Sequence, residues 1–385
     1  MSGKRFKIGI IGLQPGRSWA ARAHVPALRS LSDDFEIVGV ANSSRESAEA
    51  AAAATGIPRA FADVSELVAS PDVEIVAVTV KVPHHFDLVQ AAVDAGKHVY
   101  CEWPLGNGLA EAEQMAAMAK AKGVLGVVGT QARVSPAVAY VRDLIADGYV
   151  GEVLSVSLVG RSRGWGGTFD RSASGGTYVL DKANGATMLT IPIGHTLAAV
   201  RETLGPFATL SAQISNRRSS VLASDTGEML PMTAPDQVIL IGTLESGAPL
   251  SLTYLGGTPR GDVGLLWEIN GSDGELRVTG LNGHTQVVEL SVEGGRGEDK
   301  GMRRLEVPPS YLEGCPAEVV AGNVARLYAR MAADIRAGTR TAPTFDDAVE
   351  VHRVLAAAEE SSGVGRRMTC AATEGLKPQN SASRR

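Results

Sequence analysis

The side chains that could do chemistry are densest between residues 161 and 195. This glycine-containing stretch combines charged hydrogen-bond donors, carboxylates and aromatic rings, a mixture that suits a polyhydroxylated ligand. Lys182 and Tyr178 could carry a proton if the protein lowers their pKa toward neutrality. The alternative is a solvated loop whose side chains touch no ligand. The candidate substrate-binding residues of the stretch are Arg163, Trp165, Asp181 and Asn184.

A glycine-rich turn near the N-terminus is a candidate phosphate-binding loop. It spans residues 12–20, Gly-Leu-Gln-Pro-Gly-Arg-Ser-Trp-Ala, between an expected strand and an expected helix. Glycine lets backbone N–H groups approach a pyrophosphate at the start of a helix. The spacing is not the usual Gly-x-Gly-x-x-Gly, and a plain β–α turn is the alternative interpretation. The residues expected to contact a dinucleotide here are Gly12, Gly16, Ser18 and Trp19.

The tip of the next expected strand bears on the choice of cofactor. Domains that prefer NAD usually carry an acidic residue there for the ribose 2′-hydroxyl. Residues 42–45 read Asn-Ser-Ser-Arg and contain no carboxylate. Ser43, Ser44 and Arg45 could bind a 2′-phosphate, because guanidinium pairs bidentately with phosphate. This favours NADP(H) over NAD(H), unless Ser43 or Ser44 caps the following helix and Arg45 is solvated.

The elements that must position these residues alternate between short β-branched runs and alanine-rich helical stretches. Over the first 130 or so residues this alternation predicts an N-terminal Rossmann domain of the α/β class, a doubly wound parallel sheet. Expected strands lie at 6–12, 35–41, 73–80, 97–101 and 124–129, and expected helices at 18–31, 45–55, 85–95 and 108–122.

After Gly151 the strand-like segments follow one another with glycine-rich turns, at 246–247 and 271–274 among others. This pattern predicts a C-terminal α+β domain with a large, mostly antiparallel sheet. The expected strands are 153–159, 210–214, 237–244, 250–255, 265–269 and 276–278, and the expected helices are 317–337 and 345–359. We expect a dinucleotide-binding domain at 1–133, a substrate and oligomerisation domain at 134–370 whose helix at 345–365 packs back on the first domain, and a disordered tail at 371–385.

The composition narrows the class of partner. A net charge of −5 and a pI near 5.9 argue against nucleic-acid or membrane-surface binding. Three scattered cysteines make neither a disulfide framework nor a metal site. The start of the chain lacks the apolar core of a signal peptide. We expect a cytoplasmic protein that forms a homo-oligomer through the exposed face of its C-terminal sheet.

Residues 95–104, Ala-Gly-Lys-His-Val-Tyr-Cys-Glu-Trp-Pro, resemble a signature of the glucose-fructose oxidoreductase / inositol dehydrogenase / rhizopine-catabolism (Gfo/Idh/MocA) family. The family motif reads Ala-Gly-Lys-His-Val, then Glu-Lys-Pro. The resemblance implies that Glu102 and Trp103 lie in the cofactor site, with Trp103 in place of the lysine that serves proton transfer. Within the family, the chain resembles the branch of the fungal galactose-pathway repressor at 131–136, 148–151 and 194–196.

Two further segments carry the resemblance. Residues 80–85, Val-Lys-Val-Pro-His-His, are similar to the family's Thr-Pro-Asn-x-x-His, which implies a cofactor-side role for His85. Lys81 ends a core strand at the ligand crevice, where it could contact the cofactor or substrate or be solvated. Residues 185–195 resemble a second signature, in which an aspartate and a histidine four residues later face the substrate. His195 is kept, whereas Ile191 stands in place of the aspartate.

Two functions therefore compete. The resemblance implies an NAD(P)-dependent oxidoreductase acting on a sugar, cyclitol or related hydroxy or carbonyl compound. His195 would then carry the proton, with Lys182, Tyr178 or Lys81 assisting, and no metal is expected. Trp103 and Ile191 instead favour a catalytically silent, dinucleotide-binding regulator that acts through protein contacts.

Overall fold

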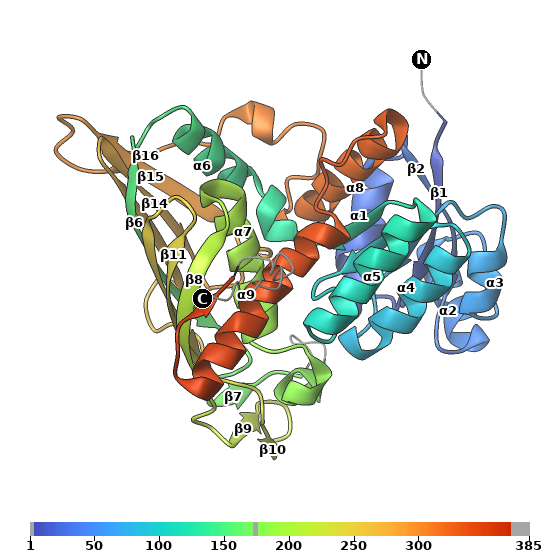
Figure 1. The fold of residues 1–385 in the computed structure, drawn as a ribbon. Coiled ribbons are helices and arrows are strands. Elements are labelled where there is room, and N and C mark those ends of the chain that lie inside the picture. The colour runs from blue at the N-terminus through green and yellow to red at the C-terminus, as the bar shows by residue number, and fades with distance from the viewer. Residues whose placement is uncertain (1–3, 172–175, 371–385) are drawn as a thin grey trace, which may run out of the picture.

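The structure is a computed structural model that describes residues 4–171 and 176–370 (Figure 1). Its N-terminal part is built on a five-stranded parallel sheet with strand order β2-β1-β3-β4-β5. The strand interiors are buried, as expected where helices cover both faces of a parallel sheet. The predicted Rossmann sheet is confirmed. Its strands are β1 (Phe6–Ile11), β2 (Phe35–Ala41), β3 (Ile75–Val78), β4 (His98–Glu102) and β5 (Gly126–Gly129).

Alternate strand residues feed two cores, one on each face of this sheet. One core takes in α3, α4 and α5, and the other takes in α1, α2 and the C-terminal helix α8. Side-chain caps fix several helix starts: Ser44 precedes α2 and Asp63 precedes α3. The first helix opens as a π-helix, η1 (Ala20–His24). The helices are α1 (Val25–Ser30), α2 (Arg45–Thr55), α3 (Val64–Ala69), α4 (His85–Asp94), α5 (Leu109–Lys122) and α8 (Val319–Ala337), with the 3₁₀ turns η2 (Val82–His84) and η3 (Gln131–Val134).

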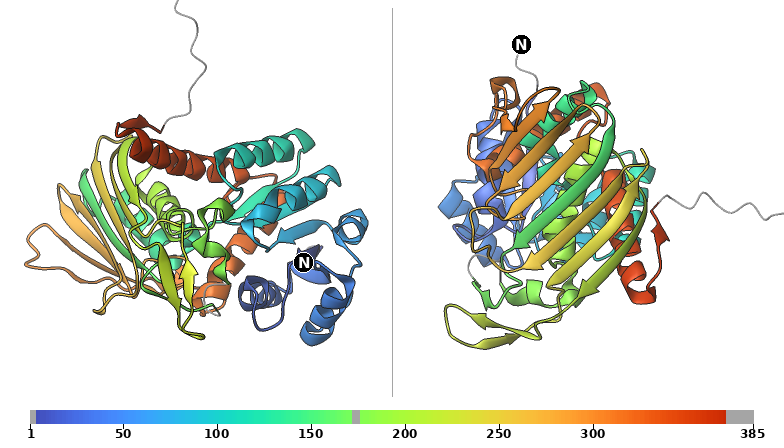
Figure 2. Two further views of the ribbon diagram at one scale, coloured as in Figure 1. Left: turned by 90° about the horizontal axis from the view of Figure 1, so that it is seen from below. Right: turned by 90° about the vertical axis from the view of Figure 1, so that its left-hand side faces the viewer.

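The C-terminal part is built on a nine-stranded sheet of order β16-β15-β14-β13-β6-β12-β11-β8-β17. Only the β6–β12 pair is parallel among its described pairings, so the predicted large, mostly antiparallel sheet is confirmed. Figure 2 shows this sheet with one face toward helices and the other face bare of them. Its strands are β6 (Val153–Ser162), β8 (Phe207–Ser215), β11 (Gln237–Leu244), β12 (Pro249–Gly256), β13 (Leu265–Gly271), β14 (Gly274–Gly280), β15 (Leu290–Arg296), β16 (Arg303–Arg304) and β17 (Met368–Thr369).

Several short elements were not expected from the sequence. A small sheet is made of β7 (Thr168–Phe169), β9 (Ser220–Ala223) and β10 (Met229–Pro231), and strands this short leave almost no periodic pattern. The strand β15 was also not expected, because Gly294 and Gly295 interrupt the alternation of apolar and polar residues in its sequence. The remaining elements are α6 (Pro136–Ala146), α7 (Gly194–Leu204), α9 (Phe345–Val364), the π-helix η6 (Leu189–Ile193) and the 3₁₀ turns η4 (Thr177–Leu180), η5 (Lys182–Asn184) and η7 (Pro309–Tyr311).

The C-terminal helices join the two parts. α8 packs on α1 and η1, and α9 lies between α5 and β8 (Figure 1). Arg133 of η3 adds a largely buried ion-pair cluster, in which its Nε lies 2.5 Å from Glu202 and its Nη1 lies 2.8 Å from Asp347. The expected tail at 371–385 lies outside the described residues, and the limits at 133 and 134 stay predictions.

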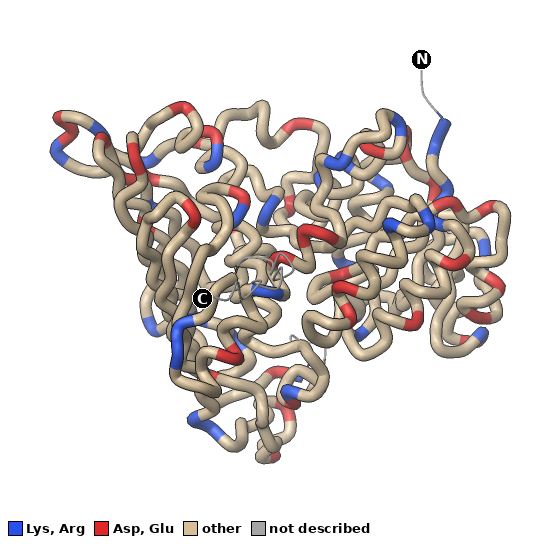
Figure 3. Tube along the Cα trace, viewed as in Figure 1, with Lys and Arg blue, Asp and Glu red and all other residues tan. Residues whose placement is uncertain are grey.

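Lys and Arg positions (blue) and Asp and Glu positions (red) are interspersed along the described Cα trace (Figure 3). No described helix is both long enough and apolar enough to cross a bilayer.

Candidate functional site

The carboxyl ends of the parallel strands meet along one edge, where β1 lies beside β3 although β2 follows β1 in the chain. Such a switch in strand order opens the crevice in which doubly wound domains bind ligands. Gly12 lies at this point with a φ of +99°. A Cβ added to it would come within 2.5 Å of Val80 Cγ1 and 3.2 Å of the Thr79 carbonyl oxygen. Glycine therefore lets the loop after β1 pass close to the end of β3.

Two side chains fix the shape of the candidate phosphate loop. Ser18 Oγ accepts from the N–H groups of Gln14, at 2.9 Å, and Ala21, at 3.3 Å. Asn42 forms a reciprocal pair with the backbone of Leu13, both bonds at 2.9 Å. Ser18 was expected to contact the dinucleotide, and the structure gives it a loop-shaping role. Asn42 was missed, although its place at the tip of the second strand was a usable signal.

One buried N–H group near this loop is free to donate to a pyrophosphate. Trp19 Nε1 is buried and has no hydrogen-bond partner among the described residues. A buried N–H without an acceptor costs free energy, so a bound acceptor would be stabilising there. Gly16, at a φ of +69°, is exposed and has no atoms near its missing Cβ. Gly12, Gly16 and Trp19 therefore all lie in the segment between β1 and η1, where the sequence predicts a phosphate-binding loop.

At the expected ribose end, the structure shows the alternative that the sequence left open for Ser44. Its side chain caps α2 by accepting from Ser47 N–H at 3.2 Å. Arg45 is exposed and pairs with Glu49, with 2.9 Å between Nε and Oε1. Exposed ion pairs of this kind contribute little to stability, so Arg45 can exchange Glu49 for a stronger anion. Ser43 is exposed beside them.

His85 and Lys81 follow β3 but differ in environment. His85 is fully buried, and its Nδ1 lies 2.9 Å from the carbonyl oxygen of Pro104, while its Nε2 lies 3.1 Å from that of Val80. Burial lowers the pKa of His85. A neutral ring donates from one nitrogen only, so His85 donates to one of these carbonyls and packs against the other, between the loop after β3 and the loop after β4. The structure therefore assigns His85 a bracing role. Lys81 is exposed, with its Nζ 5.1 Å from the centre of the Tyr178 ring.

Glu102, at the end of β4, is the centre of a buried hydrogen-bond network. Its Oε1 lies 2.8 Å from His24 Nε2, and its two oxygens accept from Gln131 Nε2 at 3.0 and 2.9 Å. His24 Nδ1 in turn lies 2.7 Å from the hydroxyl of Tyr328 in α8. Four separate elements are joined in this way. The sequence had suggested a cofactor contact for Glu102, and its hydrogen bonds in the structure go to protein groups.

Trp103 is packed inside the protein. Its Nε1 donates to the Thr190 carbonyl at 2.7 Å, and its ring centre lies 4.7 Å from that of His352 in α9. A Cβ added to Gly194 would lie 2.7 Å from the indole, and Trp103 is only 5% exposed. The indole therefore fills the junction between η6, α7 and α9, at the position of the lysine in the Glu-Lys-Pro motif.

His195, in the first turn of α7, is 3% exposed, and its Nδ1 has no partner among the described residues. Burial, followed by the nearby His284, lowers the pKa of His195 to about 3, so the ring is neutral near pH 7. His284 Nε2 lies 2.9 Å from Ser162 Oγ. The rings of Trp165 and His284 are nearly parallel, with 6.2 Å between their centres. Trp165 Nε1 donates to the Val179 carbonyl at 3.0 Å. Trp165 thus supports the site from within, and His284 was not expected from the sequence.

The predicted polar stretch divides in two. Tyr178 is mostly buried, which raises its pKa to about 12, and its carbonyl accepts from Asn184 Nδ2 at 2.8 Å. Asp181 is exposed and accepts from Ala183 N–H at 3.0 Å, which caps η5 and lowers its pKa. Arg163 is exposed next to Ser162. Tyr178 is therefore the member of the stretch that reaches the edge of the parallel sheet, through Lys81.

Lys182 lines a cavity of about 640 Å³ between α5, the segment 182–190, β8 and α9. Glu359 and His352 line it too, and its described lining includes neither His195 nor Tyr178. Burial raises the pKa of Glu359, an effect that Lys182 opposes. The structure therefore does not bring Lys182 together with His195.

No cluster of three or more potential metal ligands occurs among residues 4–171 and 176–370. What the edge offers instead is a glycine turn after β1 and a tyrosine–lysine pair after β3, while neutral His195 lies in the first turn of α7. These groups are suited to hold a dinucleotide and to move a proton on a neighbouring hydroxyl or carbonyl.

Comparison with known proteins identifies the family of this chain. Residues 6–130 match the family described as "Oxidoreductase family, NAD-binding Rossmann fold", and residues 136–280 match "Gal80p, C-terminal domain". The dehydrogenase aclE of Aspergillus oryzae is 34% identical over 287 residues, which are 72% of this chain and 77% of the relative. The galactose/lactose metabolism regulatory protein GAL80 of Saccharomyces cerevisiae is 25% identical over 94% of this chain and 93% of its own.

A crystal structure of a super-repressor mutant of Gal80p from Saccharomyces cerevisiae superimposes with a TM-score of 0.86. It covers 95% of this chain and 98% of its own at 23% identity, a likeness of fold. Together these matches confirm the family that the sequence motifs indicated. The chain belongs to the Gfo/Idh/MocA oxidoreductase family and shares the Gal80-type C-terminal domain.

Proposed function

We propose that the protein is an NAD(P)-dependent oxidoreductase acting on a sugar, cyclitol or related hydroxy or carbonyl compound. The observation that carries the proposal is the pairing of Lys81 with Tyr178 at the carboxyl end of β3, beside the Gly12 cradle. A bound nicotinamide would supply hydride transfer, and the chain must then supply a proton carrier. Relatives such as aclE are named dehydrogenases, which supports the class of reaction.

In this proposal Tyr178 is the proton carrier, and the Lys81 ammonium over its ring favours the phenolate. Burial alone holds the pKa of Tyr178 near 12, so a general base at neutral pH needs a charged neighbour of this kind. Neutral His195 supplies a hydrogen bond to the reacting oxygen through a ring nitrogen. Lys182, in the cavity with Glu359, is an accessory residue that binds or positions and does not react.

The experiment is turnover of NADH and NADPH on a panel of sugars, cyclitols and ketones. Tyr178→Phe should lower kcat by roughly 10²–10⁴-fold, the usual contribution of a positioned acid or base, with little change in cofactor Kd. Lys182→Ala is the matched control within the same stretch and should change kcat much less. A Tyr178→Phe variant with wild-type kcat would remove Tyr178 from the mechanism.

We also propose NADP(H) as the preferred cofactor, with Arg45 and Ser43 on the 2′-phosphate. The absence of a carboxylate at 42–45 and the weak, exposed pairing of Arg45 with Glu49 support this.

A second candidate is a regulator that binds the dinucleotide without turning over a substrate. It is favoured by the packed indole of Trp103 at the position of the lysine in the family motif, by Ile191 at the position of the aspartate, and by the likeness to GAL80 regulatory proteins. Tight cofactor binding without turnover of any panel compound would support it.

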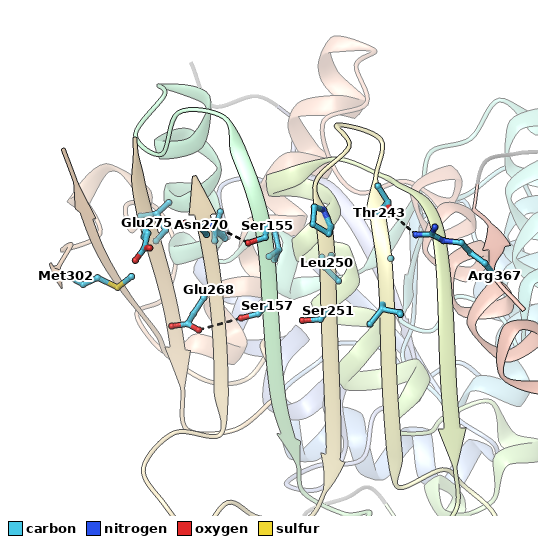
Figure 4. Close-up of a pocket in the computed structure, with 16 residues that line it drawn as sticks. Ser155, Ser157, Thr243, Leu250, Ser251, Glu268, Asn270, Glu275, Met302 and Arg367 are labelled. Atoms are coloured by element: carbon cyan, nitrogen blue, oxygen red, sulfur yellow. Dashed lines mark hydrogen bonds between the residues drawn. The ribbon is translucent and has the colours of Figure 1, made fainter. Parts of the chain in front are cut away.

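We further propose that two copies associate through the bare face of the nine-stranded sheet. Val159, Ile239 and Ile241 are 42–58% exposed on this face, which is unusual for large apolar side chains in strands. A shallow groove runs beside them across β6, β11, β12, β13 and β14 (Figure 4). Its polar side chains are already paired within the face, Ser157 with Glu268 and Arg367 with Thr243, so a second copy can cover it without leaving these groups unpartnered.

A further inference from the structure

A cavity of about 380 Å³ lies away from the edge of the parallel sheet, between the start of α6, β15, the segment 304–319 and α8. None of its lining residues belongs to the site described above. Its walls are mostly aliphatic, with Val288, Leu290 and Val292 on one side and Leu305, Val307 and Leu312 on the other. At the roughly 30 Å³ that one water occupies in the liquid, it has room for about a dozen non-hydrogen atoms.

One cationic side chain in this wall has no anionic partner. Arg326 of α8 is about half-buried, and its described hydrogen bonds are two long ones, 3.4 Å each, from Nε and Nη2 to the Tyr311 carbonyl. It takes part in no ion pair in the described structure. Burial lowers the pKa of Arg326, and no carboxylate is among the groups that offset this effect.

Two neighbouring arginines have the carboxylate partner that Arg326 lacks within the part of the chain that the structure describes. Arg133 and Arg142 each pair with Glu202 at 2.5 and 3.0 Å. The two glutamates that line the cavity are exposed at its rim, and Glu306 is occupied by Arg304 at 2.9 Å. A guanidinium withdrawn from water is costly unless an anion meets it. Arg326 is therefore placed to bind an anion that enters with an apolar body.

We propose that this cavity binds a medium-chain aliphatic carboxylate, with the carboxylate on Arg326 and the chain among the aliphatic walls. The guanidinium offers parallel N–H donors that match a carboxylate bidentately. Gly322, one helical turn before Arg326, lets the guanidinium lie close to α8, because a Cβ there would clash with the Pro316 carbonyl oxygen and lie 2.9 Å from Arg326 Nη1. The size of the cavity corresponds to decanoate, which has twelve non-hydrogen atoms in all.

The cavity carries its own reporter. Cys315 lines it and is the one cysteine of the three that is not buried. In the full-length protein, alkylation of Cys315 by iodoacetamide should slow when decanoate fills the cavity, and a titration of the rate yields a Kd. A Cys315→Ser variant identifies the part of the reaction that belongs to this thiol.

The test compares decanoate with decan-1-ol on wild-type protein and three variants. We expect decanoate to protect Cys315 at concentrations at least tenfold lower than decan-1-ol, because a hydrogen bond to a charged group is lost in the alcohol. Arg326→Gln should abolish this preference. Arg330→Gln is the matched control, since Arg330 lies one helical turn further along α8, is half-buried, forms no described ion pair and does not line the cavity. Ala137→Leu, which keeps the arginine and fills the space, should abolish binding.

Equal protection by acid and alcohol would overturn the proposal, as would wild-type decanoate binding by Arg326→Gln or by Ala137→Leu. No protection of folded wild-type protein at millimolar decanoate would overturn it too. Circular dichroism of each variant establishes that it is folded. The outcome is independent of whether the protein turns over a nicotinamide cofactor.

Discussion

Replacing Gly194 by alanine tests the packing of Trp103 directly. Gly194 has helical backbone angles, φ −59° and ψ −43°, so alanine suits the backbone and would by itself stabilise the helix by up to about 1 kcal/mol. Its Cβ, however, would lie 2.7 Å from both Nε1 and Cζ2 of the indole. Overpacking of a buried contact costs about 1–3 kcal/mol, so we expect Gly194→Ala to be neutral or destabilising by up to about 2 kcal/mol.

The double-mutant cycle with Trp103→Phe isolates that contact. Phenylalanine lacks Nε1 and Cζ2, so the added methyl group should be tolerated beside it. Trp103→Phe alone should cost about 1–3 kcal/mol, since it leaves the Thr190 carbonyl without its 2.7 Å donor. The double variant should therefore be about 1–3 kcal/mol more stable than the sum of the two single changes implies.

Urea unfolding followed by far-UV circular dichroism measures the free energy of unfolding of all four proteins, without depending on indole fluorescence. Strict additivity, within about 0.5 kcal/mol, would refute the packing argument and mean that the indole moves away from Gly194. In that case Trp103 would again be a candidate for contact with the ligand.

Three further predictions rest on single sites. Arg45→Ala should raise the Kd for NADPH at least tenfold and change the Kd for NADH by no more than about twofold, as measured by cofactor fluorescence. Equal losses of affinity for the two cofactors would refute the assignment of Arg45 to the 2′-phosphate. Ile241→Asp on the bare sheet face should convert a dimer to a monomer in light scattering, whereas Leu281→Asp, also an exposed apolar residue but outside the sheet strands, should not. Burial lowers the pKa of His195 to about 3 and those of His284 and His352 to about 4, below the value near 6.5 expected in the unfolded chain. Their contribution to stability is therefore complete above pH 6.5 and is lost as pH falls, by about 1.4 kcal/mol per pH unit for each histidine. His195→Gln should reduce the slope of the free energy of unfolding against pH between pH 6.5 and 5. An unchanged slope would mean that His195 is protonated in the folded protein.

The fold was largely predictable because long elements leave a period in the sequence. The run at 237–244 is rich in apolar and β-branched residues and is the strand β11 with those bounds, and 45–55 is the helix α2. Short or interrupted elements were missed for the same physical reason. β15 loses its pattern at Gly294 and Gly295, and α3 spans only six residues.

The site was less predictable, because burial and side-chain partners depend on residues far apart in the chain. The expected strand at 97–101 corresponds to β4, so the sequence indicated that Glu102 and Trp103 lie at its end, and their place in a cofactor site stays a prediction. The family motifs did not indicate that Glu102 would be held by His24 and Tyr328, or that the indole would turn toward α9. Ser44 illustrates a choice that the sequence left open, since capping and phosphate binding need the same hydroxyl group.

We propose that this site transfers hydride although Trp103 stands in place of the lysine of the family motif. Wild-type protein is incubated with a pool of candidate carbonyl compounds and either NADPH or NADH, each carrying deuterium at C4 of the nicotinamide. The products are then analysed for deuterium. We expect deuterium on carbon in at least one reduced product, and we expect Tyr178→Phe, which still binds the cofactor, to slow the transfer by roughly 10²–10⁴-fold. Saturable cofactor binding with no deuterium in any product would contradict it and establish the protein as a dinucleotide-binding regulator.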